Sequence, residues 1–284
     1  MLKHIAQIFK VQNEFPKRIK HRHRIFWTPP DAEYIRNTIM NAGDPVEKWK
    51  DVEHWQRKLS NKYNAREFAR MHHCNVARLY WKGRDPERID FSALPPHYVI
   101  RPTIGHSCNK VFLMRGDLNL MDKQVYTKHA IFTILKEMVM NDPYQEILIE
   151  EFLRSEAGEY RIPDDYKIYV FNGEVAFIAL INRFGRRTGQ HNFYDETWSI
   201  IRKCHSGYPM APYQPPPRCL NQMLRDAREL SKAYEIFVRI DFYATDRGAV
   251  FGEFTPTPSL GYGFSKFGEQ RLLSYWDLYC KGRI

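Results

Sequence analysis

The sequence predicts an α+β fold, and three kinds of local pattern carry that prediction. Short apolar runs rich in β-branched and aromatic residues recur along the chain. The clearest turn between two such runs is Asn172-Gly173, a pair that favours a two-residue hairpin. Two longer stretches, 128–139 and 220–234, are typical of helices. Hairpins mixed with helices favour layered α+β architecture over a doubly wound parallel sheet.

The first half of the chain predicts helices, then a hairpin, then a further helix and strand. Residues 1–30 are basic and end at a Pro-Pro break. Three helical segments are expected in 31–75: one carrying Tyr34, Ile35 and Ile39 after Asp31, one after Asp44-Pro45, and one over 59–70. Strands are expected at 98–100, 110–114 and 147–149, with the helix 128–139 before the last strand.

The second half predicts two hairpins separated by a loop and a helix. Strands over 165–171 and 174–181 flank the Asn172-Gly173 turn. A Pro-rich loop, 209–217, precedes the helix 220–234. The second hairpin pairs 236–244 with 249–254.

Composition indicates a reduced globular protein. The 284 residues are 43% hydrophobic, and no run approaches the roughly 18 apolar residues of a membrane-spanning helix. The N-terminus has no signal-peptide core, so a cytoplasmic location is expected. Five cysteines without a CxxC pair argue against a disulfide framework and a structural zinc site.

The net charge of +10 suggests an anionic partner: nucleic acid, a membrane face or a nucleotide. No RNA-binding signature is present, so we expect no nucleic-acid partner. Part of the excess is a basic run over 17–24, preceded by apolar residues Leu2, Ile5, Ile8 and Phe9 on one face of a possible helix. The run fits either a solvated arm or an amphipathic anchor at a membrane surface.

The second hairpin carries the strongest chemical pattern. Strand side chains alternate, so Arg239, Asp241 and Tyr243 share one face, as do Glu253 and Thr255 on the return strand. If the faces coincide, two carboxylates and a guanidinium meet. Mg²⁺ takes carboxylate and phosphate oxygens, and Arg can offset the remaining phosphate charge. The alternative is an ordinary hairpin with an exposed salt bridge.

This segment, with Gly252 to Ser259, resembles the metal-binding end of the ATP-grasp superfamily, and more narrowly the TupA-like branch named for teichuronopeptide biosynthesis. The resemblance runs from about Leu59 to Leu278. Its other motifs are Leu59-Ser60-Asn61-Lys62-Tyr63 with Arg66-Glu67, Ile89-Asp90-Phe91 ahead of Leu94-Pro95, Pro163-Asp164-Asp165-Tyr166-Lys167 with Phe171-Asn172-Gly173, and Asn192-Phe193-Tyr194-Asp195 with Trp198.

The resemblance implies an ATP-grasp fold, with ATP between two α+β lobes. Residues 1–58 would form a basic, helical N-terminal region. Residues 59–284 would form the ATP-grasp domain, with a smaller lobe over about 98–150 and a larger one over about 151–284.

The resemblance also implies roles for individual residues. Arg101 stands where the family has a phosphate-binding lysine, and a loop with Gly105 and Ser107 would close over the phosphates, although an ordinary hairpin turn is the alternative. The adenine would meet Glu150, Glu151, Phe152 and Leu153, unless these simply end a solvated strand. Lys167 would contact phosphate, while Asp241, Glu253 and Thr255 would hold Mg²⁺. Arg239, Lys167 and Arg101 would be the catalytic cations.

Three functions follow from these patterns. The first is an ATP- and Mg²⁺-dependent ligase that activates a carboxylate as an acylphosphate for attack by an amine, in cell-surface polysaccharide or peptide-polymer biosynthesis. The second is a kinase with a sugar or other hydroxyl acceptor. The third is a non-catalytic module that binds polyanions or membranes through the basic N-terminus. The acceptor of the ligase would be a small molecule, a peptide or a saccharide. The protein itself would be cytoplasmic, with peripheral contact to the inner face of the membrane through its basic N-terminus as a further expectation. Trp198 and the loop 209–217 would border its pocket.

Overall fold

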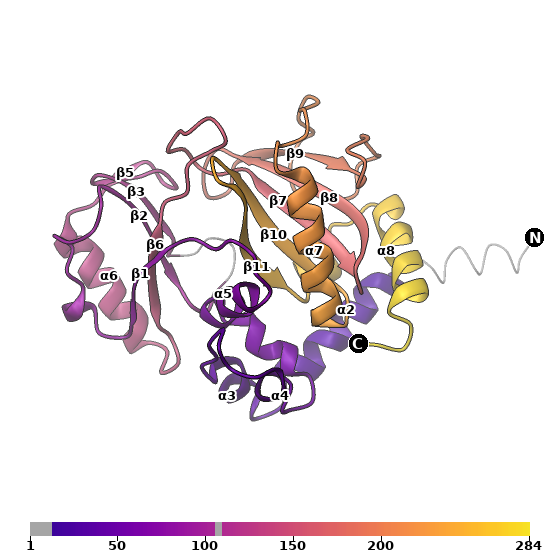
Figure 1. Ribbon diagram of the computed structural model, residues 1–284, viewed down its shortest axis with the longest axis horizontal. Helices are drawn as coiled ribbons and strands as arrows, with labels where there is room; N and C mark the ends of the chain where they lie inside the picture. Colours follow the sequence, from indigo (N-terminus) through magenta and orange to yellow (C-terminus); the bar gives the residue numbers. More distant parts are fainter. Residues whose placement is uncertain (1–12, 106–109) are drawn as a thin grey trace, which may run out of the picture.

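The computed structural model describes residues 13–105 and 110–284, in which two antiparallel sheets with attached helices lie side by side (Figure 1). The predicted α+β class is therefore confirmed. The possible apolar helix face at 2–9 and the site candidate Ser107 lie outside the described residues.

The smaller lobe is a six-stranded sheet with the order β1-β6-β2-β3-β4-β5, in which all neighbours are antiparallel. The predicted hairpin is its β2/β3 pair. Helix α6 (Lys128–Met140) begins at Thr127, whose hydroxyl accepts a hydrogen bond from the Ala130 N–H, and its apolar face packs on this sheet. The strands are β1 (Leu79–Gly83), β2 (His97–Pro102), β3 (Phe112–Arg115), β4 (Leu118–Asn119), β5 (Gln124–Val125) and β6 (Ile147–Glu151).

The larger lobe is a five-stranded antiparallel sheet with the order β11-β10-β7-β8-β9. The turn between β7 and β8 is Asn172-Gly173, and both residues have positive φ (50° and 93°), as the sequence pair predicts. The strands are β7 (Asp165–Phe171), β8 (Glu174–Arg183), β9 (Gly189–Tyr194), β10 (Val238–Thr245) and β11 (Gly248–Thr255).

Two helices cover opposite faces of this larger sheet. Along β7, Ile168 and Val170 join the core under α7 (Leu220–Tyr234), whereas Tyr169 and Phe171 join the core under α8 (Lys266–Tyr279). Strand alternation therefore places α7 and α8 on different sides. The α8 face is apolar only at one end of the strands, and its other end carries the charged residues of the site.

The N-terminal helices pack against the larger lobe. The basic run lies in α2, and the expected solvated arm is wrong for residues 17–24, because one face of this helix is docked. Arg22 is fully buried and donates hydrogen bonds to the carbonyls of Phe237 (2.6 Å) and Pro256 (3.1 Å), while Arg18 pairs with Asp277. These helices are α2 (Glu14–Trp27), α3 (Ala32–Asn37), α4 (Val46–Trp49), the 3₁₀ helix η1 (Trp55–Ser60) and α5 (Lys62–Met71).

Several elements were not predicted from the sequence, among them α8, β1 and β9. Helix α8 has Gly268 in its first turn, which weakens a helical pattern. The glycine is explained by packing: a Cβ there would lie 2.3 Å from the carbonyl oxygen of Cys204. The predicted helix through Ile39 ends earlier, at Asn37. Within the described part of the chain, no helix is both long and apolar enough to cross a membrane.

Candidate functional site

The site is built on the bulged hairpin of β10 and β11. Asp241 lies directly opposite Glu253, and Arg239 lies opposite Thr255, so the four side chains share one face. Gly252 has no partner on β10, which makes it the bulged residue. A Cβ at Gly252 would lie 3.0 Å from the Asp241 carbonyl oxygen, so only glycine fits this close approach without displacement.

Two cations from different strands form hydrogen-bonded ion pairs with the buried carboxylate of Asp241. Arg239 donates from Nε to Oδ1 (2.7 Å) and from an Nη to Oδ2 (2.9 Å). Lys167, which faces Asp241 from β7, donates to Oδ2. Burial by itself would raise the pKa of Asp241, but Arg239 and Lys167 outweigh burial and lower it below its ordinary value. Asp241 is therefore ionised at neutral pH.

Glu253 is less enclosed, and its oxygens reach two cations only loosely. Arg239 lies 3.4 Å from Oε1, and the amine of Lys62 lies 4.0 Å from Oε2. The Lys62 amine also donates to the carbonyl of Gly105 (2.8 Å). Gly105 has a φ of 141°, which favours glycine. Lys62, from the start of α5, is thus brought to the site although its motif had received no role.

A second acid and a second arginine extend the network along the sheet. Asp165 lies 3.5 Å from the Lys167 amine and accepts a hydrogen bond from Arg183 at 2.5 Å. Tyr243 completes the face, and burial raises its pKa well above the ordinary value, with the Asp165 carboxylate adding to the effect. Its hydroxyl therefore keeps its proton. Strand alternation on β7 could have singled out Asp165, two residues before Lys167.

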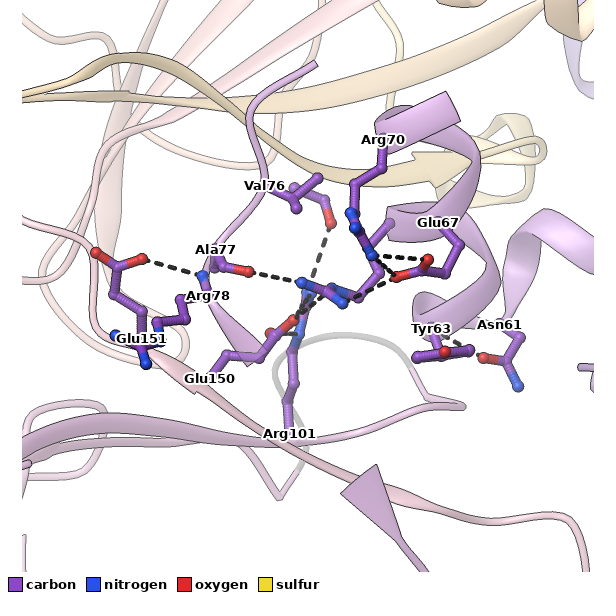
Figure 2. Close-up of polar contacts among 12 residues, drawn as sticks. Asn61, Tyr63, Glu67, Arg70, Val76, Ala77, Arg78, Arg101, Glu150 and Glu151 are labelled. Atoms are coloured by element: carbon purple, nitrogen blue, oxygen red, sulfur yellow. Dashed lines mark hydrogen bonds and ion pairs between the residues drawn. The ribbon is translucent and has the colours of Figure 1, made fainter. Parts of the chain in front are cut away.

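The smaller lobe contributes Arg101 from β2. Its guanidinium faces Glu150 on β6 in Figure 2, with Nε at 2.5 Å from Oε2 and an Nη at 3.3 Å from Oε1. Another Nη lies 3.5 Å from the carbonyl oxygen of Gly252, which links the two sheets. Burial would lower the pKa of Arg101, but Glu150 outweighs burial and raises it. Arg101 is therefore firmly charged.

The segment expected to meet adenine connects the two sheets. Glu151 pairs with Arg247 at 2.6 Å and accepts from the Arg78 N–H, as Figure 2 shows for Arg78. Phe152 and Leu153 are buried. The side chains of Glu150 and Glu151 are therefore engaged in ion pairs and do not simply end a solvated strand.

The donor set fits a magnesium–phosphate complex better than a bare metal ion. Among the described residues, no group of three or more His, Cys, Asp and Glu could hold a metal. Asp241 and Glu253 form a pair of hard oxygen donors, and Mg²⁺ commonly takes one or two carboxylates and completes its sphere with phosphate oxygens and water. The surrounding cations would meet the remaining phosphate charge.

The two features expected to border the acceptor pocket lie away from the charged residues of the site. Trp198 is buried, stacks on Tyr194 at 4.1 Å and donates to the Gln214 carbonyl. It belongs to the core under α7, on the sheet face opposite Lys167. The Pro-rich loop follows the β9 edge, where the Ala211 N–H donates to the His191 carbonyl. This edge is at the far side of the sheet from β11.

Comparisons with known proteins agree with this fold. A family model described as TupA-like ATPgrasp matches residues 46–273. Among solved structures, the chain is similar to a D-alanine–D-alanine ligase from Bacillus anthracis complexed with ATP, with a TM-score of 0.50, 14% identity and coverage of 76% of this chain and 64% of that chain.

The chain is also similar to the VanG D-Ala:D-Ser ligase from Enterococcus faecalis, with a TM-score of 0.51, 14% identity and coverage of 79% of this chain and 63% of that one. At this identity the likeness shows the ATP-grasp fold alone. The chain spans less than two thirds of the length of either structure. A search of curated proteins by sequence finds no significant match.

Proposed function

Since the chain belongs to the TupA-like ATP-grasp family, as the match over residues 46–273 shows, we propose that it is an ATP- and Mg²⁺-dependent ligase. In the proposed reaction a substrate carboxylate attacks the γ-phosphorus of ATP, and ADP leaves. An amine then attacks the resulting acylphosphate and loses a proton to solvent, an amide bond forms, and inorganic phosphate leaves with the bonding electrons.

The single observation that supports this proposal most is that the carboxylates of Asp241 and Glu253 lie together on one sheet face with cations around them. Asp241 and Glu253 would hold Mg²⁺ together with phosphate oxygens, and the Thr255 hydroxyl would reach a metal-bound water. Bound Mg²⁺ would neutralise charge on the phosphates. A simple polyanion binder gains nothing from two carboxylates among its cations, which disfavours the non-catalytic module.

The cations are proposed to align and stabilise the transferring phosphoryl group. Lys167 and Arg239 would turn from Asp241 toward phosphate oxygens, and Arg101 would approach from the smaller lobe. Phosphoryl transfer leaves little covalent chemistry to side chains, so placing positive charge is the protein's main contribution. Lys62 is a further candidate, because its amine already lies beside Glu253.

The remaining nucleotide contacts are proposed from the resemblance and from position. Gly105 and Ser107 would cover the phosphates, and the segment from Glu150 and Glu151 through Phe152 to Leu153 would border the adenine. The domain division at residue 58, with the lobes meeting near 150, is part of the same proposal. Its support is that Glu150 and Glu151 end the last strand of the smaller lobe before the chain enters the larger one.

The acceptor is proposed to be a small molecule, a peptide or a saccharide used in cell-surface polymer biosynthesis, because the TupA-like branch is named for teichuronopeptide biosynthesis. We place the protein in the cytoplasm, with peripheral contact to the inner membrane face. The exposed cations Lys17, Lys20 and Arg24 of α2 support that contact.

Two measurements test the proposal. Thermal melting with ATP and Mg²⁺ should give a higher midpoint than ATP alone, because a ligand bound only to the native state stabilises it. Turnover with candidate acceptors in the presence of hydroxylamine should yield a hydroxamate, which traps the acylphosphate. A stable phosphate ester in place of a joined product would instead identify a kinase. No melting shift at saturating nucleotide would overturn both enzyme proposals.

A further inference from the structure

The carboxylate of Glu150 is almost completely buried and faces two guanidinium groups. Arg101 binds it with two hydrogen bonds of 2.5 and 3.3 Å, and the Nε of Arg66 lies 3.5 Å from Oε1. Figure 2 shows the side chains of Glu150 and Arg101 meeting beside the α5 helix that carries Glu67 and Arg70. A buried carboxylate needs such partners, because leaving it without a counter-charge is strongly unfavourable.

One nitrogen of the Arg66 guanidinium makes no hydrogen bond to the described residues, and it is the nitrogen beside Glu150. Its two Nη groups are occupied by Glu67 (3.0 Å) and by the Ala77 carbonyl (2.8 Å). Its Nε is buried and makes no hydrogen bond within the part of the chain that the structure describes. Burial lowers the pKa of Arg66 and outweighs Glu150 and Glu67, so its charge is incompletely compensated.

Arg101 cannot satisfy Glu150 and a phosphate group equally well. Its two hydrogen bonds to Glu150 come from Nε and one Nη, which together form one of the two guanidinium edges that can bind a phosphate bidentately. The other Nη lies 3.5 Å from the Gly252 carbonyl oxygen. If Arg101 turned toward a nucleotide, Glu150 would lose its closest partner. A shift of Arg66 toward Glu150 would not leave Glu67 without a partner, because Arg70 binds both oxygens of Glu67 at 3.1 and 3.0 Å.

We propose that Arg66 is a positioning residue that takes over the Glu150 carboxylate when Arg101 turns to the nucleotide phosphates. This proposal rests on the proposed ATP-binding function. The exchange needs a small movement, because a charge-assisted hydrogen bond forms at about 2.8 Å and the Arg66 Nε starts at 3.5 Å. The Ala77 carbonyl and Glu67 keep the guanidinium in place while Nε closes this distance.

The test compares two arginines of the same helix. Arg66→Met removes the second arginine beside Glu150, whereas Arg70→Met removes a half-exposed arginine whose partner is Glu67. The ligands are the non-hydrolysable analogue AMPPNP with Mg²⁺, and AMP, which lacks the β- and γ-phosphates. Affinities are measured by isothermal titration on the full chain.

Arg66→Met should weaken AMPPNP binding at least about tenfold and leave AMP within about twofold, because only the outer phosphates require Arg101. Arg70→Met should leave both within about twofold. Because Glu150 also borders the proposed adenine site, its variants are judged by AMPPNP affinity relative to AMP affinity, a ratio in which a shared adenine contact cancels. Glu150→Gln releases Arg101, so this ratio should be at least that of the unmodified chain. Arg66→Met with Glu150→Gln should regain the ratio that Arg66→Met lost.

Three results would overturn the proposal: unchanged AMPPNP affinity in Arg66→Met, equal losses for AMPPNP and AMP, or no recovery in the double variant. If Arg66→Met does not fold, Glu150→Gln alone decides, since a fall in AMPPNP affinity that AMP does not share would contradict the release of Arg101. Failure of the proposed function looks different, because then the unmodified chain and Arg70→Met would both fail to bind AMPPNP.

Discussion

Asp241 shows how one side chain can serve both stability and chemistry. It is nearly inaccessible, yet it stays ionised because Arg239 and Lys167 surround it. The two cations in turn depend on Asp241, since a buried charge without a partner is costly. The same grouping leaves Glu253 more exposed and only loosely paired, so it is the more accessible of the two carboxylates.

Replacing Asp241 should therefore lower both the stability of the fold and the Mg²⁺-dependent binding of ATP. Asp241→Asn leaves Arg239 and Lys167 without their main counter-charge, and the free energy of unfolding should fall by about 3–5 kcal/mol. The Mg²⁺-dependent part of the melting shift with ATP should disappear. Denaturant unfolding and thermal melting measure the two effects. Asp277→Asn, whose exposed carboxylate pairs with Arg18, is the matched control and should change stability by about 1 kcal/mol or less. Equal behaviour of the two variants would contradict the assigned role.

His191 supplies a second prediction at this scale, because it is buried on β9 and its Nε2 has no hydrogen-bond partner in the described chain. Burial, with the nearby charge of Lys203, lowers its pKa to about 4. Between the ordinary pKa of about 6.5 and about 4, the unfolded chain binds a proton that the folded chain does not. His191 should therefore make stability fall as the pH drops through this window.

The measurement is the free energy of unfolding at several pH values between 7 and 4, for the unmodified chain and His191→Phe. The aromatic replacement keeps the ring contact with Phe193, which lies 4.6 Å away, and removes the titrating group. Its stability should depend less steeply on pH in this window. Identical slopes would show that His191 does not titrate as described.

At the scale of secondary-structure elements, the bulge in β11 decides how the two carboxylates are aligned. Without an extra residue at Gly252, the pairs beyond Asp241 would shift by one position, and strand side chains would exchange faces. Gly252 also offers its carbonyl to Arg101, so the bulge touches the smaller lobe. The hairpin of β10 and β11 therefore both carries the site residues and contacts the sheet of the smaller lobe.

Gly252→Ala tests the bulge. The added methyl would lie 3.0 Å from the Asp241 carbonyl oxygen and 3.1 Å from the Tyr243 ring, so the strands must move apart, at a cost of about 1–3 kcal/mol in unfolding free energy. The affinity for ATP with Mg²⁺ should fall as well. Gly43→Ala is the control, because no atom lies within 4 Å of its added methyl; it should be neutral or slightly stabilising. A neutral Gly252→Ala would contradict the requirement for glycine.

At the scale of the whole molecule, the two sheets meet through charged groups as well as through the covalent connection after β6. Arg101 reaches the Gly252 carbonyl, and Glu151 pairs with Arg247 across the same junction. Such exposed or long contacts are individually weak. A ligand that contacts both Arg101 and Asp241 would therefore strengthen the noncovalent association of the two lobes.

Hydrogen exchange can detect this coupling. Binding of AMPPNP with Mg²⁺ should slow amide exchange in β2 and β6 of the smaller lobe and in β10 and β11 of the larger lobe at the same ligand concentration, since one ligand stabilises both. Helix α3, away from the junction, is the internal control and should exchange unchanged. Protection confined to a single sheet would contradict a nucleotide held between the lobes.

The sequence by itself determined the local features of this protein. Strand alternation and hairpin turns depend on residues close in the chain, so the Asn172-Gly173 turn, the helix 220–234 and the meeting of Asp241 with Glu253 could all be predicted. The family motifs added the ATP-grasp fold, which the structure and the comparisons confirm.

Only the tertiary structure decided which distant groups meet. Lys167 contacts Asp241 across 74 residues. Arg22 is buried against carbonyls more than 200 positions away, in a basic run that by sequence fitted either a solvated arm or a membrane anchor. The approach of Lys62 to Glu253 and the two arginines on Glu150 are of the same kind. Local periodicity specifies the face of an element, whereas burial and charge pairing depend on which elements pack against that face, and this is settled by the free energy of the whole fold.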